Sequence, residues 1–487
     1  MKPCHLLAIA AAVVGLTVPG PDSRGEADNT PKPPPQIVTA DARITVSPKQ
    51  WGVSTRYIGG TEGSSRFNID DLTDCGINTL RIYGDMSRFE PADDGGLYGS
   101  PSIAEIKANP NVIPWKRWDE VMDSAYAPGV PNVTWRSMFK DLRRANVTTV
   151  ISLRNRDTAI HPAWIAAVPK TDADWNEWWE YVFAIAYWLN VRNDYRIDDF
   201  EVLNEPDNTP QQGWLGTREE YCKMVRKTKD ALDCLYQTYL PGRAYHVHAP
   251  VTSGPDWVPG VLADAGGSFD SLNVHWYAWW DKGDFVRKMH HYLAQSGHPG
   301  YPIWLSEWGT YDVSYDETYM GLAVVENLIR FSQPGDDYVY GSHIFSFYDW
   351  VYEGQSNWGV VAGDGTRRAT YYALRLAIRA LAGAKPTFQT IADAPDLSAI
   401  ATRDADGRIN LLVLNWGDKV SYDIRADLSA LGGSLLLPHG TATIRQFSAN
   451  VHDDVVGQAQ VKDGMTQFAS PPWSAVLVTC TRADEPA

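Results

Sequence analysis

Short apolar segments alternate with amphipathic helical segments along most of the chain. Candidate strands begin near Trp51, Asn78, Thr148, Phe200, Tyr245, Leu272, Ile303 and Ser342. Alternation of strand and helix is typical of parallel β/α units, and eight such strands are the number that closes a (β/α)8 barrel. The pattern therefore predicts an α/β protein with a (β/α)8 TIM barrel over residues 41–382.

Two helical segments carry capping signals at their predicted starts. Thr171 stands three residues before Asp174, and Thr217 three residues before Glu220. A hydroxyl and a carboxyl side chain at that spacing can form a capping box. Both segments continue with apolar residues at separations of three, four or seven, which predicts one buried face on each helix.

The pattern changes after Leu381. Gly383-Ala384-Lys385-Pro386 interrupts the helical spacing, and alternating or continuously apolar strand candidates follow, such as residues 409–415, 442–447 and 474–479. These predict a β-sandwich domain over residues 383–487. Residues 36–46, an extended segment ahead of the barrel, are a candidate strand to complete that sandwich.

The N-terminus has the pattern of an export signal. Lys2 precedes an apolar run over residues 6–18, which Pro19-Gly20-Pro21 ends. A run of this length is too short to cross a bilayer and is typical of a secretory signal peptide. We therefore predict a signal peptide over residues 1–27, a proline-rich linker over 28–40, and a secreted protein, extracellular or periplasmic.

Composition narrows the possible partners. The chain has 487 residues and a formal net charge of −16, from 43 Lys and Arg against 59 Asp and Glu. Nucleic acids and anionic membranes repel such a protein, whereas a neutral carbohydrate does not. The 20 tryptophans and 24 tyrosines could stack on sugar rings. Packing between a barrel and its helices accounts for most of them.

Two glutamates stand at the ends of predicted strands. Asn204-Glu205-Pro206 follows the apolar segment 200–203, and Glu307 follows the segment 302–306. Catalytic residues of a parallel barrel collect at the carboxyl ends of its strands. Cleaving a glycosidic bond needs such a pair, because one carboxyl group protonates the leaving oxygen while the other attacks the anomeric carbon or activates water.

The strand ends together resemble the large clan of retaining (β/α)8 glycoside hydrolases. In chain order the matching residues are Arg81, Asn204, Glu205, His275, Tyr277, Glu307 and Trp350. Within the clan, family 39 is the most similar, through Asn204 to Asp207, through Glu307-Trp308 with Ser314-Tyr315, and through the appended sandwich. Leu203 stands where the xylosidases of that family have a tryptophan, which puts a xylosidase activity in doubt.

The resemblance implies a role for each matching residue. Glu205 would be the acid/base, in surroundings that keep a proton on it at neutral pH, and Glu307 the nucleophile. Arg81 and Tyr277 would keep Glu307 ionised. Asn204 would bind the sugar 2-hydroxyl, His275 would orient the site, and Trp350 would form the floor of the subsite. Trp276 and Trp280, beside His275, are further candidates for stacking on sugar.

The sequence thus predicts a secreted retaining β-glycoside hydrolase that cleaves a poly- or oligosaccharide by double displacement, without a cofactor or metal. A transglycosylase would use the same covalent intermediate. A non-catalytic carbohydrate-binding barrel is the alternative from another class, although the presence of both glutamates favours an enzyme. Taken singly, an arginine or histidine at a strand end is more often structural than functional.

Overall fold

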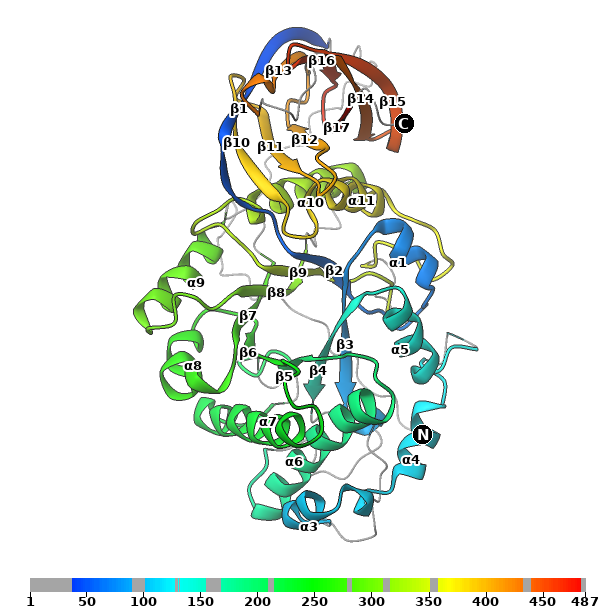
Figure 1. Cartoon of the computed structure of the whole chain (residues 1–487), viewed down its shortest axis with the longest axis vertical. Helices are drawn as coiled ribbons and strands as arrows, with labels where there is room; N and C mark the ends of the chain where they lie inside the picture. Colours follow the sequence, from blue (N-terminus) through cyan, green and yellow to red (C-terminus); the bar gives the residue numbers. More distant parts are fainter. Residues whose placement is uncertain are drawn as a thin grey trace, which may run out of the picture.

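The chain forms a barrel and an all-β domain that meet on a shared pair of helices (Figure 1). The computed structural model describes residues 37–89, 101–127, 130, 132–154, 168–208, 214–277, 283–309, 316–350, 358–431 and 439–482. The predicted signal peptide and most of the predicted linker lie outside the described residues. Among the helices described, none has the length and apolar character needed to cross a membrane.

The predicted (β/α)8 barrel is confirmed. Eight parallel strands pair in chain order, and the first also pairs with the last, so the sheet closes. The strands are β2 (Tyr57–Thr61), β3 (Thr79–Asp85), β4 (Thr148–Arg154), β5 (Asp199–Val202), β6 (His246–Thr252), β7 (Ser271–Trp276), β8 (Ile303–Trp308) and β9 (Gly341–Ile344).

The first predicted barrel strand was misplaced. Trp51 lies near the end of β1 (Val38–Val53), which pairs with β10 (Pro386–Ala392) and β13 (Val420–Asp427) of the all-β domain. The barrel begins instead at Tyr57. The two apolar segments follow one another within a few residues, so their spacing alone could not assign them to different sheets.

Helices surround the barrel between its strands (Figure 1). The capping boxes predicted at Thr171 and Thr217 are both present. The helices are α1 (Ile69–Cys75), α2 (Met86–Phe89), α3 (Ile103–Ala108), α4 (Trp115–Met122), α5 (Trp135–Arg144), α6 (Asp172–Tyr187), α7 (Arg218–Tyr239), α8 (Val258–Ala265), α9 (Asp284–Gln295), α10 (Glu317–Phe331) and α11 (Ala369–Leu381).

Polar side chains occupy the inside of the barrel. Alternate residues of a strand point to opposite faces of its sheet. In β3, Leu80 and Ile82 join the apolar layer beneath the helices, while Arg81 between them hydrogen-bonds Glu201 of β5. On the same face, Thr79 bonds His343 of β9 at 2.9 Å. The barrel therefore holds a polar network below its carboxyl end.

Within the described residues, the all-β domain is a closed sheet of nine strands, in which the last strand of the hydrogen-bonded order pairs with the first. A tight turn joins β15 and β16. The segment 36–46, predicted as an added strand, falls largely within β1. The remaining strands are β11 (Leu397–Arg403), β12 (Ile409–Asn415), β14 (His439–Ser448), β15 (Val451–Lys462), β16 (Met465–Ser470) and β17 (Ser474–Arg482). Apolar side chains on the inner face form a core separate from that of the barrel.

Helices α10 and α11 lie between the two parts (Figure 1). Phe447 of β14 is fully buried and belongs to the same apolar cluster as the barrel core. A Cβ atom added to Gly321 of α10 would lie 2.6 Å from Cζ of Phe447 and 3.0 Å from Cβ of Ala373 in α11. Asp453 of β15, also buried, accepts from Arg375 and Arg379 of α11 at 2.6 and 3.1 Å. The junction is therefore closely packed and is held by ion pairs to the buried carboxylate of Asp453.

Gly321→Ala tests that packing. Alanine favours a helix over glycine by about 1 kcal/mol, but overpacking a core costs about 1–3 kcal/mol. We expect a lower free energy of unfolding, measured by urea denaturation. In a Phe447→Leu background, which makes room for the methyl group, the same change should be neutral or stabilising. Equal stabilisation in both backgrounds would contradict the close contact.

Candidate active site

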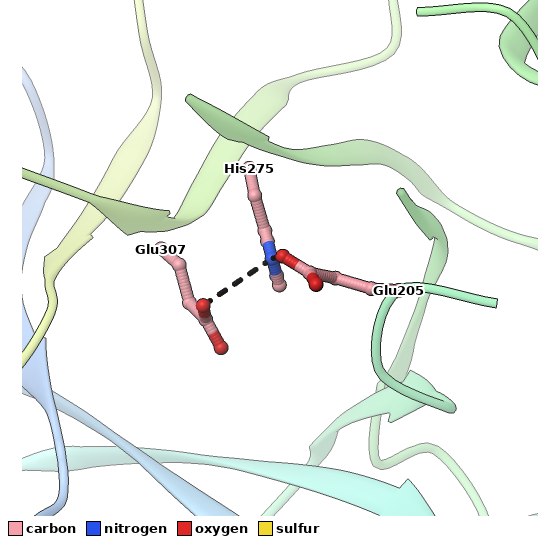
Figure 2. A group of neighbouring side chains, drawn as sticks. All are labelled: Glu205, His275 and Glu307. Atoms are coloured by element: carbon pink, nitrogen blue, oxygen red, sulfur yellow. Dashed lines mark hydrogen bonds and ion pairs between the residues drawn. The ribbon is translucent and has the colours of Figure 1, made fainter. Parts of the chain in front are cut away.

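Two carboxyl groups face each other at the carboxyl end of the barrel. Glu205 follows β5 and Glu307 lies at the end of β8, with His275 of β7 beside both (Figure 2). Glu205, Glu307 and His275 are 6%, 4% and 1% exposed. One carboxylate oxygen of each glutamate and a ring nitrogen of His275 all lie within 4.8 Å of one another. The structure thus brings the two predicted glutamates together.

Arg81 is the centre of the hydrogen-bond network. Its side chain has no exposed surface. Nε donates to Glu201 at 2.6 Å, and Nη1 donates to Glu307 Oε1 at 2.6 Å. Nη2 donates to Asn204 Oδ1 at 2.8 Å. Because a guanidinium is planar and presents its donors in a fixed fork, one residue sets the positions of these three side chains.

Glu307 is held as a carboxylate. Burial opposes its ionisation, but the charges of His275 and Arg81 and hydrogen bonds from two tyrosines outweigh burial and lower the pKa of Glu307 to about 2. Tyr83 donates to Oε1 at 2.5 Å, and Tyr277 donates to Oε2 at 2.7 Å. A buried carboxylate that stays ionised at neutral pH can act as a nucleophile or can stabilise a developing positive charge.

The backbone around Glu205 has an uncommon conformation. Leu203 and Glu205 have φ values of 63° and 45°, in the left-handed region that favours glycine, and Val251 of β6 has 57°. The Glu205 N–H donates to the Val251 carbonyl at 2.8 Å. Such residues cost about 1–3 kcal/mol each and persist only where surrounding contacts hold them. Here the conformation carries the Glu205 side chain over the barrel mouth toward Glu307.

His275 joins the two glutamates. Nδ1 lies 2.7 Å from Glu205 Oε1 and 3.4 Å from Glu307 Oε2. Burial lowers the proton affinity of the ring, but Glu307 and the hydrogen bond to Glu205 outweigh burial and raise the pKa of His275. A protonated Nδ1 therefore hydrogen-bonds Glu205 and places its positive charge beside Glu307.

Glu205, His275 and Glu307 are also the one group of described residues whose ligand atoms lie close enough for a metal ion. Their partners fit a cation poorly. Oε1 of Glu307 already accepts from Arg81, whose fixed positive charge would repel a metal, and Oε2 accepts from Tyr277. The lone pairs of the cluster are directed at hydrogen-bond donors, so the arrangement suits proton transfer.

The other predicted residues divide between the site and the core. Tyr277 contacts Glu307, as described. Trp350 is 6% exposed, and its ring lies 5.5 Å from that of Tyr83 and stacks on Phe345 at 6.0 Å, so it borders the site.

The prediction that Trp276 stacks on sugar is wrong. Trp276 is 2% exposed and packs on Phe331 of α10, in the layer between barrel and helices. Since it follows His275 directly in a strand, it points to the opposite face. Trp280, Ser314 and Tyr315 lie outside the described residues.

Sequence reasoning missed several polar neighbours of the pair. Tyr83 contacts the Glu307 carboxylate, and Glu201 pairs with Arg81 and accepts from Asn273 at 2.7 Å. Asn208 donates to Glu205 Oε2 at 3.0 Å. Tyr83 stands two residues after Arg81 in one strand, and Glu201 interrupts an otherwise apolar strand. The period of two that places alternate residues on one face was therefore a usable signal for both.

Known structures share this architecture. No protein-family model matches the chain, and no curated protein matches it. A glucosidase from Croceicoccus marinus has a TM-score of 0.66 at 12% identity, covering 91% of this chain and 100% of that chain. A GH39 β-xylosidase from Caulobacter crescentus has a TM-score of 0.63 at 16% identity, covering 90% and 100%.

A GH30 endoxylanase from Clostridium papyrosolvens has a TM-score of 0.60 at 14% identity, covering 91% of this chain and 100% of that chain. The predicted resemblance to the (β/α)8 glycoside hydrolase clan, with GH39 structures among the similar ones, is confirmed. At these sequence identities the likeness shows the fold alone.

Arg81→Met tests the buried network. The substitution leaves Glu201 and Glu307 without their shared cation, and breaking a buried pair in this way costs about 3–5 kcal/mol. Folding lowers the pKa of Glu307 from 4.5 to about 2. Its ionisation therefore stabilises the fold above about pH 4.5, and this contribution is lost as the pH falls toward about 2.

Without Arg81 the pKa of Glu307 rises. The loss of stability in urea denaturation should then be full at about pH 7 and smaller at about pH 4, where the carboxyl groups can bind protons. Adding Glu201→Gln should recover part of the loss at neutral pH. A loss that does not change with pH, or that grows toward acid, would contradict the role of Arg81.

Proposed function

We propose that the protein is a secreted retaining β-glycoside hydrolase that acts on a poly- or oligosaccharide, with Glu205 as acid/base and Glu307 as nucleophile. The observation that carries the proposal is the approach of the two carboxyl groups, because one oxygen of each lies within 4.8 Å of one oxygen of the other. Retaining enzymes separate their carboxyl groups by roughly 5–5.5 Å, whereas inverting enzymes need roughly 6.5–9.5 Å to admit a water molecule.

The hydrogen bonds of Glu307 favour Oε2 as the attacking atom. Oε1 accepts from both Arg81 and Tyr83, which occupy its lone pairs. Oε2 accepts from Tyr277 and faces His275, on the side of Glu205. In the first step Oε2 forms a bond to the anomeric carbon while the bond to the leaving oxygen breaks. Glu205 gives its proton to that oxygen, which leaves as an alcohol.

The second step reverses these roles. Glu205, now a carboxylate, takes a proton from water, and the water oxygen attacks the anomeric carbon. The bond to Glu307 breaks, which regenerates the carboxylate and yields the β-configured sugar. A sugar hydroxyl in place of water would give transglycosylation by the same residues. Arg81 holds Asn204 beside the reaction centre, in support of its predicted contact with the 2-hydroxyl.

The all-β domain has a structural role in this proposal. Among its described strands, no pair of buried carboxylates faces an aromatic wall, and one face of its sheet packs on α10 and α11. We propose that its closed sheet is flattened into two packed layers, as in the predicted sandwich. Export through the N-terminal signal completes the proposal.

Kinetics of two variants test the assignment. Glu307→Ala removes the covalent step, so hydrolysis of every β-glycoside should fall by roughly 10⁴-fold or more. Glu205→Ala removes the proton donor and the later base. Aryl glycosides with good leaving groups should then show a burst followed by slow turnover, because forming the intermediate needs no proton. Glu120→Ala, at an exposed site on α4, serves as the control.

Azide separates the two roles. With Glu205→Ala it should attack the glycosyl-enzyme, restore turnover and give a β-glycosyl azide. With Glu307→Ala it should attack the substrate directly and give the α product. The opposite products would exchange the two roles. Full activity in both variants would place the chemistry elsewhere, and binding of glycans without cleavage by the wild type would favour the non-catalytic barrel.

A further inference from the structure

Asn208 lies three residues after Glu205 and contacts it twice. Its backbone N–H donates to the Glu205 carbonyl at 3.0 Å, which closes a turn through Pro206 and Asp207. Its side-chain Nδ2 donates to Glu205 Oε2 at 3.0 Å. Proline suits the second position of such a turn, because its ring fixes φ. The turn therefore brings the side-chain amide of Asn208 back to the carboxyl group of Glu205.

The turn is fixed to the neighbouring strand end. Asp207 accepts from the backbone N–H groups of Ser253 and Gly254 at 2.8 and 3.0 Å, and from the Ser253 hydroxyl at 3.1 Å. These bonds join the loop after β5 to the loop after β6. Asn208 consequently approaches Glu205 from a fixed direction, which a residue on a free loop would not do.

The two oxygens of Glu205 have different partners. Oε1 faces His275 Nδ1 at 2.7 Å, on the side of Glu307, whereas Oε2 accepts from Asn208. In the described part of the chain, the titratable groups around Glu205 are His275, Asp207 and Glu307 with its partners Tyr83 and Tyr277. Arg81 lies behind Asn204. Asn208 adds a hydrogen-bond donor to this group without adding a charge.

We propose that Asn208 is a positioning residue that holds Oε2 of Glu205 and balances its two roles, proton donor in the first step and base in the second. The proposal rests on the proposed function of Glu205. An N–H donor stabilises a carboxylate more than a carboxylic acid. It therefore stabilises the carboxylate that remains once the proton has gone to the leaving oxygen, and it orients that carboxylate to accept a proton from water.

Two substitutions separate positioning from structure. Asn208→Leu keeps the size of the side chain and the backbone turn but removes the donor. Without the donor the carboxylate form loses a hydrogen bond, so the alkaline limb of the pH profile of kcat/KM should move upward by roughly one pH unit. Asn208→Asp, which suits a turn, adds a like charge beside Glu205 and should move the limb at least as far. Either variant tests the proposal if the other does not fold.

The leaving group provides a second readout. A weaker acid slows departure of a poor leaving group, so kcat/KM for an alkyl or sugar leaving group should fall by roughly tenfold in Asn208→Leu. An activated aryl glycoside, which needs no proton, should lose much less. Alkaline limbs that coincide with the wild type, or equal losses on both substrates, would overturn the proposal and leave Asn208 with a purely structural role in the loop.

Failure of this proposal differs from failure of the proposed function. If the wild type cleaves glycosides and azide rescues Glu205→Ala as described, unshifted limbs in the Asn208 variants refute the positioning role alone. If the wild type cleaves none of the substrates, or Glu205→Ala remains fully active, both proposals are overturned together.

Discussion

The buried guanidinium of Arg81 is the interaction on which the site depends. It lies inside the barrel without exposed surface and pairs with Glu201 and Glu307 through separate nitrogens. Leaving one of these buried charges unpaired costs about 3–5 kcal/mol, a large part of the roughly 5–15 kcal/mol by which a domain is stable. Arg81, Glu201 and Glu307 therefore depend on one another for charge pairing. Because the fork of donors is rigid, the requirement for charge balance also fixes the direction in which the Glu307 carboxylate points.

The same network makes the two facing carboxyl groups unequal. Glu307 accepts from Arg81 and two tyrosine hydroxyls, and its pKa is lowered to about 2. Glu205 contacts His275 and the neutral amide of Asn208. Two carboxyl groups at short separation can do different chemistry only when their surroundings differ in this way. The left-handed backbone at Leu203 and Glu205 brings the second group within reach of the first.

The sequence predicted the barrel well, because alternation of strand and helix is a regular signal along the chain. It also predicted Glu205, Glu307, Arg81, His275 and Tyr277, which the structure gathers at one end of the barrel. It misassigned the strand near Trp51, because two strands of different sheets follow closely. Trp276 was predicted to stack on sugar because it lies beside His275, but neighbouring residues of a strand point to opposite faces, and Trp276 packs in the layer beneath the helices. Contacts across strands, such as Glu201 with Arg81, depend on register and cannot be inferred from spacing within one segment.

The stereochemistry of the product tests the central claim most directly. Proton NMR can follow the anomeric signal of the first product released from a β-glycoside, before mutarotation mixes the anomers. The account predicts that the β anomer appears first, because two displacements at the anomeric carbon restore its configuration. The α anomer as the first product would mean a single displacement by water, and would contradict the assignment of Glu307 as a nucleophile.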